Sequence, residues 1–91
     1  GMIVSNEPGY YEKNNFGIRI ENLIYVKKVK KRNYFENLTL VPLDKELINL
    51  KLLNKNEINW INNYHKKVFK KLSSYLNKKE KKWLKEATEA I

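Results

Sequence analysis

The chain has 91 residues, no cysteine and a formal net charge of +9, and 17 of its 19 basic residues are lysine. This length allows one small domain at most, and the lack of cysteine excludes disulfides and thiolate metal sites and suits the reducing cytoplasm. No apolar run approaches the roughly 20 residues of a membrane span, and no signal peptide is recognisable, so we expect a soluble protein with no membrane partner.

The first half of the chain predicts strands. Residues 2–7 predict a short strand that Pro8 and Gly9 end, because proline lacks a ladder donor and glycine permits a turn. Residues 13–17 have the asparagine and glycine content of a turn. Residues 18–29 alternate between apolar and polar side chains and are rich in Ile, Val and Tyr, which predicts a second strand. One face of that strand carries Ile18, Ile20 and Ile24, and the other carries Arg19, Glu21 and Leu23.

The middle of the chain is less regular. Residues 27–32 form a basic patch, where we expect the second strand to leave the sheet. Residues 38–41 predict a third strand, which Pro42 closes. Residues 43–53 are apolar without a clean period and predict an irregular connection.

Two helices are predicted in the second half. Asn54 and Glu57 have the spacing of a capping box, and apolar residues at helical spacing follow them as far as residue 75. Asn77 is predicted to cap the end of that helix, and residues 78–90 predict a second one. Four aromatic residues are expected in the core, with an interface role as the alternative: Trp60, Tyr64, Tyr75 and Trp83.

Two glutamates on the predicted strands are the candidates for chemistry. Glu7 and Glu21 could converge on a hard cation, because divalent metals prefer several oxygen ligands on rigid elements. The alternative is a surface Glu7 beside a turn and a structural pair between Arg19 and Glu21. Spacing alone leaves both interpretations open.

Longer motifs carry a resemblance to a known family. Residues 5–11 (SNEPGYY) and 16–22 (FGIRIEN) resemble the last two metal-ligand motifs of the prolidase and aminopeptidase P group, which has the pita-bread fold. Residues 38–42 and 60–65 are similar to the C-terminal extension of long aminopeptidases P. The resemblance implies an α+β chain, incomplete alone: residues 1–43 are the last strands of the catalytic domain, and residues 44–91 are the helical extension.

The resemblance also implies a function, the removal of the N-terminal residue from peptides with proline in second position. In this family two metal ions, typically manganese, are held by two Asp, one His and two Glu. By position, Glu7 and Glu21 correspond to the two Glu, Glu7 is also the general base, and Arg19 holds a ligating carboxylate. The expected partners are a proline-containing peptide, an upstream part of the same enzyme and a second copy in a cytoplasmic homodimer.

The chain lacks the other three ligands of that family. Its single Asp, Asp44, and its single His, His65, match no ligand motif, and we expect His65 to serve packing or capping. The chain alone is therefore expected to be inactive.

Two alternatives remain open. A non-catalytic pita-bread relative would characteristically lose metal ligands, whereas Glu7, Glu21 and Arg19 are present. A basic module could bind nucleic acid or an acidic surface. Arginine, the better reader of phosphates and bases, is scarce here, so no nucleic-acid partner is expected.

Overall fold

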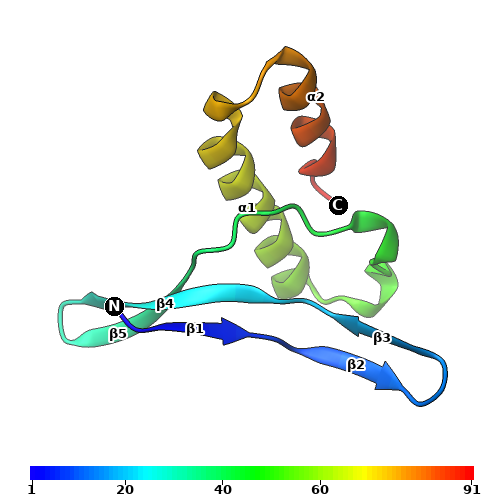
Figure 1. Ribbon diagram of the computed structural model, residues 1–91, viewed down its shortest axis with the longest axis horizontal. Coiled ribbons are helices and arrows are strands. Elements are labelled where there is room, and N and C mark those ends of the chain that lie inside the picture. The colour runs from blue at the N-terminus through cyan, green and yellow to red at the C-terminus, as the bar shows by residue number, and fades with distance from the viewer. The chain divides into compact units, whose positions relative to one another are not determined.

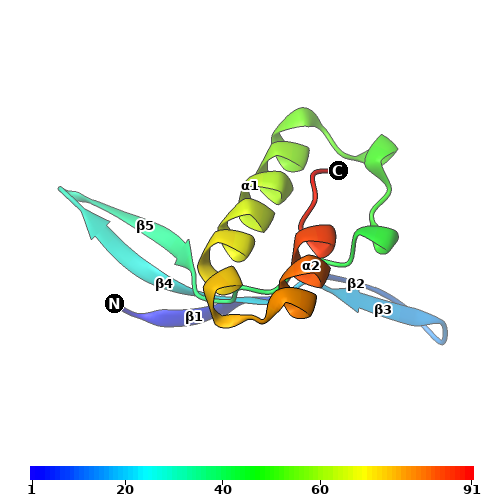
Figure 2. The ribbon, with the colours of Figure 1, turned by 90° about the horizontal axis from the view of Figure 1, so that it is seen from above.

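The computed structural model describes residues 1–91, which divide into two compact units, Gly1–Thr39 and Leu40–Ile91. The first unit contains only strands and turns, and the second contains the helices (Figure 1; Figure 2). The predicted order of antiparallel strands followed by two helices is confirmed. No helix is both long enough and apolar enough to cross a membrane.

Five antiparallel strands make up the first unit. They are β1 (Ile3–Asn6), β2 (Gly9–Glu12), β3 (Phe16–Arg19), β4 (Asn22–Val29) and β5 (Arg32–Asn37). β4 lies between β1 and β5 in one sheet, and β2 pairs with β3 in another.

The two sheets share one hairpin register. β1 pairs with β4 from Ile3 and Tyr25 to Asn6 and Asn22, and β2 pairs with β3 from Gly9 and Arg19 onward. The Ile20 amide donates to the Pro8 carbonyl at 3.0 Å, so the register continues through the gap. Pro8 has no amide hydrogen to return a bond, and the regular ladder is interrupted there.

The basic patch at residues 27–32 is the end of a hairpin, formed by the last residues of β4, a two-residue turn and the first residue of β5, so the prediction that the strand leaves the sheet there was wrong. Lys30 and Lys31 connect β4 to β5, with Val29 opposite Arg32. Lys30 has a φ of 55°, which lies in the left-handed region that favours glycine.

The predicted strand at residues 38–41 is also absent. The amides of Leu38 and Thr39 both donate to the Leu23 carbonyl, at 2.8 and 3.4 Å. The Thr39 hydroxyl accepts from the Leu23 amide at 2.8 Å, so a side chain takes the place of a ladder partner. The strand lies earlier, at Arg32–Asn37, and its mostly polar residues give no strand pattern in the sequence.

The second unit is built on α1 (Lys55–Leu72) and α2 (Lys78–Ala87), with single 3₁₀ turns at Lys45–Leu47, Leu50–Leu52 and Ser73–Tyr75. The capping box is confirmed: the Glu57 amide donates to Asn54 Oδ1, and the Asn54 amide donates to Glu57 Oε2, both at 2.9 Å. Asn77 does not end α1. It begins α2, where its side chain accepts from the Glu80 amide at 2.9 Å.

A small core lies where the helices meet the segment before them. Tyr64, Val68 and Leu84 are buried there. Five partly buried side chains pack around them: Leu40, Leu43, Phe69, Leu72 and Leu76.

The predicted aromatic core is correct only for Tyr64. Trp60, Trp83 and Tyr75 are 49%, 62% and 83% exposed. Trp60 stacks on Tyr64 with ring centroids 5.4 Å apart, and so covers the core from outside. Each lysine-rich helix buries only one face, and in α1 that face holds Ile61, Tyr64, His65 and Val68, so the other aromatic residues stay at the surface.

Candidate metal centre

Glu7 and Glu21 lie directly opposite each other at the gap in the long hairpin. Asn6 pairs with Asn22 on one side of the gap, and Gly9 pairs with Arg19 on the other. The same register makes Glu7 the partner of Glu21. Because cross-strand partners lie on the same face of a sheet, both carboxylates project from the same face of the hairpin. The predicted face shared by Arg19 and Glu21 is consistent with this register.

Arg19 contacts both carboxylates. Its guanidinium lies 3.2 Å from Glu21 Oε2 and 3.6 Å from Glu7 Oε1. The two glutamate side chains are 40% and 44% exposed, so these ion pairs contribute little to stability. Their effect is to fix positions, since the planar guanidinium of Arg19 holds the two carboxylates side by side.

Ser5 adds a further contact on the same face. Its hydroxyl donates to Glu7 Oε2 at 2.7 Å. This hydrogen bond lowers the pKa of Glu7 below its ordinary value. Desolvation opposes it, and the charge of Arg19 and a contact with Glu21 lower the pKa further. Glu7 is therefore ionised at neutral pH, as a metal ligand must be.

Tyr11 holds Arg19, and the sequence analysis did not identify it. The ring of Tyr11 lies across Gly9 and Gly17, where an added Cβ would stand 2.8 Å from the Tyr11 hydroxyl and 2.6 Å from its Cδ1. The Tyr11 hydroxyl and the two glutamates raise the pKa of Arg19. A tyrosine opposite a glycine, with a second glycine two residues before it, is a signal that could have revealed this contact.

The donor set fits part of a metal site. Carboxylate oxygens suit hard divalent ions, and two of them converge here from adjacent strands. No group of three or more His, Cys, Asp or Glu side chains in the chain is arranged to hold a metal ion. Glu7 and Glu21 can therefore be ligands only together with groups from outside these 91 residues.

His65 is a packing residue, as predicted. It is fully buried, and its Nε2 accepts a hydrogen bond from the Leu43 amide at 2.9 Å. Burial, and then the charge of Lys45, lowers the pKa of its imidazole. The neutral ring fastens the segment before the helices to α1. Asp44 caps the next turn, where its side chain accepts from the Glu46 amide at 3.0 Å.

Comparison with known families places this geometry in context. Residues 1–28 match the model described as metallopeptidase family M24, and residues 32–91 match the model described as the C-terminal region of peptidase_M24. This chain belongs to metallopeptidase family M24. Two-thirds of the chain thus matches the family's C-terminal region, which agrees with the strand and helix order.

Similar proteins with known names cover all or nearly all of the chain. A probable Xaa-Pro aminopeptidase P of Tuber melanosporum is 48% identical over 101 aligned residues, covering 100% of this chain and 16% of the relative. The Xaa-Pro aminopeptidase 1 of Dictyostelium discoideum is 47% identical, covering 93% and 15%. The chain thus spans about one-sixth of the length of these relatives and corresponds to the C-terminal part of an aminopeptidase P.

A solved structure agrees with the fold. The X-prolyl aminopeptidase of Caenorhabditis elegans, described as a cytosolic enzyme with a di-nuclear active site, is 39% identical. It aligns with 98% of this chain and with 16% of its own chain, with a TM-score of 0.83.

Proposed function

We propose that this chain belongs to a metal-dependent enzyme that removes the N-terminal residue from peptides with proline in second position. The observation that carries the proposal is the placement of Glu7 opposite Glu21, with Arg19 between them, in a chain of family M24. The names of the similar aminopeptidases support the same activity.

In this proposal Glu7 and Glu21 would be two ligands of a dinuclear site, and Glu21 would serve both ions. Two divalent ions, for which we propose manganese, would lower the pKa of the attacking water and polarise the scissile carbonyl. Glu7 would also accept the proton of that water, for which its carboxylate must be ionised, as its lowered pKa ensures at neutral pH. Arg19 is a positioning residue that keeps both carboxylates together.

The remaining parts of the site come from elsewhere in the same enzyme. Two Asp and one His would complete the ligand set, since no third ligand lies near Glu7 and Glu21 in this chain. A dedicated pocket would recognise proline, whose tertiary amide has no N–H. The di-nuclear site of the similar C. elegans enzyme supports two metal ions.

The proposal also covers the place of this chain in the whole enzyme. Residues 1–43 are the last strands of a catalytic domain, and residues 44–91 are a helical extension of a cytoplasmic homodimer. Apolar side chains on the even-numbered face of the hairpin are 46–60% exposed, which supports packing against further protein. They are Tyr10, Phe16, Ile18 and Ile20.

The test measures release of the first residue from an Xaa-Pro peptide by the intact protein, with and without manganese. Glu7→Gln and Glu21→Gln each change one carboxylate to an amide of the same shape. We expect each to reduce kcat by more than the about 10–100-fold typical of losing a partner behind a metal ligand.

Glu12→Gln is the matched control, because Glu12 lies on the same hairpin but on the opposite face. It should retain full activity. A rate unchanged by Glu7→Gln and Glu21→Gln would refute the assignment and leave a non-catalytic relative. An equal rate on an Xaa-Ala peptide would refute the proline preference alone.

A further inference from the structure

The proposed peptidase site makes no use of the most charged surface of the first unit, the hairpin between β4 and β5. Residues 27–32 contain five cations in six positions. Only Lys27 has a carboxylate partner, Glu36 at 3.8 Å. Four cations at the end of the hairpin have no ion pair and are exposed: Lys28, Lys30, Lys31 and Arg32.

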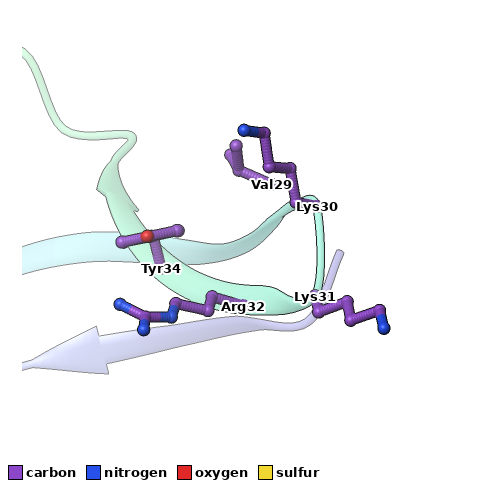
Figure 3. A pocket seen from close by; sticks show the side chains of 5 residues that line it. All are labelled: Val29, Lys30, Lys31, Arg32 and Tyr34. Atoms are coloured by element: carbon purple, nitrogen blue, oxygen red, sulfur yellow. The ribbon is translucent and has the colours of Figure 1, made fainter.

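Two further side chains complete this surface, which we call the basic hairpin tip. Tyr34 and Val29 line a hollow together with Lys30, Lys31 and Arg32 (Figure 3). Figure 3 shows Arg32 and Tyr34 along β5, while the Lys30 and Lys31 side chains leave the turn in different directions. Tyr34 is 50% exposed, so an aromatic surface lies beside the charges.

The backbone conformation of Lys30 suggests a binding role for its side chain. The turn has two central residues, and only the first, Lys30, has a positive φ, of 55°. Such a turn favours glycine at this position, and a lysine there costs conformational energy. A strained residue that carries an unpaired charge at an exposed tip is better explained by binding than by folding.

β5 offers a second recognition element. It lies at the edge of its sheet, with β4 as its only neighbour in the chain. Val29 and Arg32 flank the two-residue turn and form a hydrogen-bonded pair, so the backbone groups of Asn33 and Phe35 point away from β4. An extended peptide can add to such an edge as another strand.

We propose that the basic hairpin tip and the outer edge of β5, which pairs with no other strand of this chain, bind an acidic, extended polypeptide segment. Its carboxylates pair with Lys28, Lys30, Lys31 and Arg32, and its backbone pairs with the outward groups of β5. The edge of β5 favours a polypeptide over a nucleic acid, because only a polypeptide backbone can pair with it as another β-strand. The dominance of lysine agrees, because arginine is the better reader of phosphates and bases.

Protection of the edge is the simpler function of such charges, since lysines often shield edge strands from aggregation. Here the lysines lie on β4 and in the turn, while β5 itself carries one cation, Arg32, and one anion, Glu36. Three of the four unpaired cations are therefore placed beside the edge strand rather than on it.

The test titrates the intact protein into a fluorescein-labelled peptide of alternating Glu and Val and measures anisotropy. A combined Lys28→Gln, Lys30→Gln, Lys31→Gln and Arg32→Gln variant should weaken binding at least about tenfold, and binding should weaken as salt rises. The control neutralises four exposed lysines of α2, namely Lys78, Lys79, Lys81 and Lys82. It makes the same change in net charge and should bind like the wild type.

Two single changes separate binding from folding. Lys30→Gly relieves the turn, so the protein should be as stable as the wild type or more stable, yet bind the peptide several-fold more weakly. Asn33→Pro removes one outward amide without breaking the pairing with β4, and should also weaken binding.

Three results would overturn the proposal. The first is equal loss of binding in the α2 control. The second is a peptide affinity that neither Lys30→Gly nor Asn33→Pro reduces. The third is tighter hairpin-dependent binding of a single-stranded oligonucleotide of equal charge, or of anionic phospholipid vesicles, than of the peptide.

Discussion

At the scale of single residues, the candidate site depends on hairpin register. Alternation in the sequence was enough to predict that Arg19 and Glu21 share a face. It could not predict that Ser5 would bind Glu7, or that the Tyr11 ring would cross two glycines to reach Arg19. These contacts depend on which residues of the two strands are opposite, and the turn sets that register.

The contact between Ser5 and Glu7 gives the first residue-scale prediction. Ser5→Ala removes the hydrogen bond that contributes most to the lowered pKa of Glu7. We expect the pKa of Glu7 to rise toward its ordinary value, as followed by NMR titration of its side-chain carboxyl carbon. Thr39→Ala removes a hydroxyl from the same unit without touching Glu7 and should leave that titration unchanged. A fall in the pKa of Glu7 on Ser5→Ala would contradict this account.

His65 gives a pH-dependent prediction. Its pKa is lowered in the folded protein, so the native state favours the neutral ring. The stability contributed by this ring is fully present above the ordinary histidine pKa of about 6.5. It is lost as pH falls from there through the lower folded pKa. Protonation also removes the acceptor for the Leu43 amide.

The measurement is the hydrogen-exchange protection factor of the Leu43 amide between about pH 7.5 and about pH 5, a range that extends further below that pKa because the folded pKa is lowered. Protection should fall on acidification in the wild type. His65→Gln retains an acceptor but does not titrate, so its protection should vary less with pH. Equal pH dependence in both proteins would assign the effect to another group.

At the scale of elements, the helices were easier to predict than the strands. The start of α1 was found because the capping box is a local signal, and the structure has both of its hydrogen bonds. Asn77 was assigned to the wrong helix, because an asparagine between two helical segments suits either end. β5 was missed because a polar strand such as RNYFEN lacks an apolar period.

The capping box supplies an element-scale prediction. Asn54→Ala removes the acceptor for the Glu57 amide and should destabilise the start of α1 by about 1 kcal/mol. Faster hydrogen exchange in the first turn of α1 would report this change. Asn63→Ala, at an exposed position in the middle of the helix, is the control and should be neutral or slightly stabilising. Equal effects of the two changes would show that the cap contributes nothing.

At the scale of the whole molecule, the first unit lacks a core of its own. Asn22 is its only buried residue, whereas the second unit buries Tyr64, His65, Val68 and Leu84. Strands with exposed apolar faces require further protein to cover them. The sequence could indicate this incompleteness only through the family resemblance, because alternation does not reveal what lies against a face.

Because the chain holds only two of the proposed metal ligands, we predict that it is inactive in isolation. The isolated 91-residue chain should release no N-terminal residue from an Xaa-Pro peptide at any manganese concentration, because it lacks a third ligand. The intact protein should do so under the same conditions. Hydrolysis by the isolated chain, at a rate that Glu21→Gln abolishes, would contradict the need for outside ligands.

The most direct test of the central claim is the metal content of the intact protein, determined by elemental analysis per mole of protein after dialysis. We predict about two divalent ions in the wild type and in Glu12→Gln, as in two-metal hydrolases. Glu21→Gln, which alters the carboxylate proposed to serve both ions, should lose metal. A metal content that is the same in Glu21→Gln as in the wild type would contradict the assignment of Glu21 as a ligand.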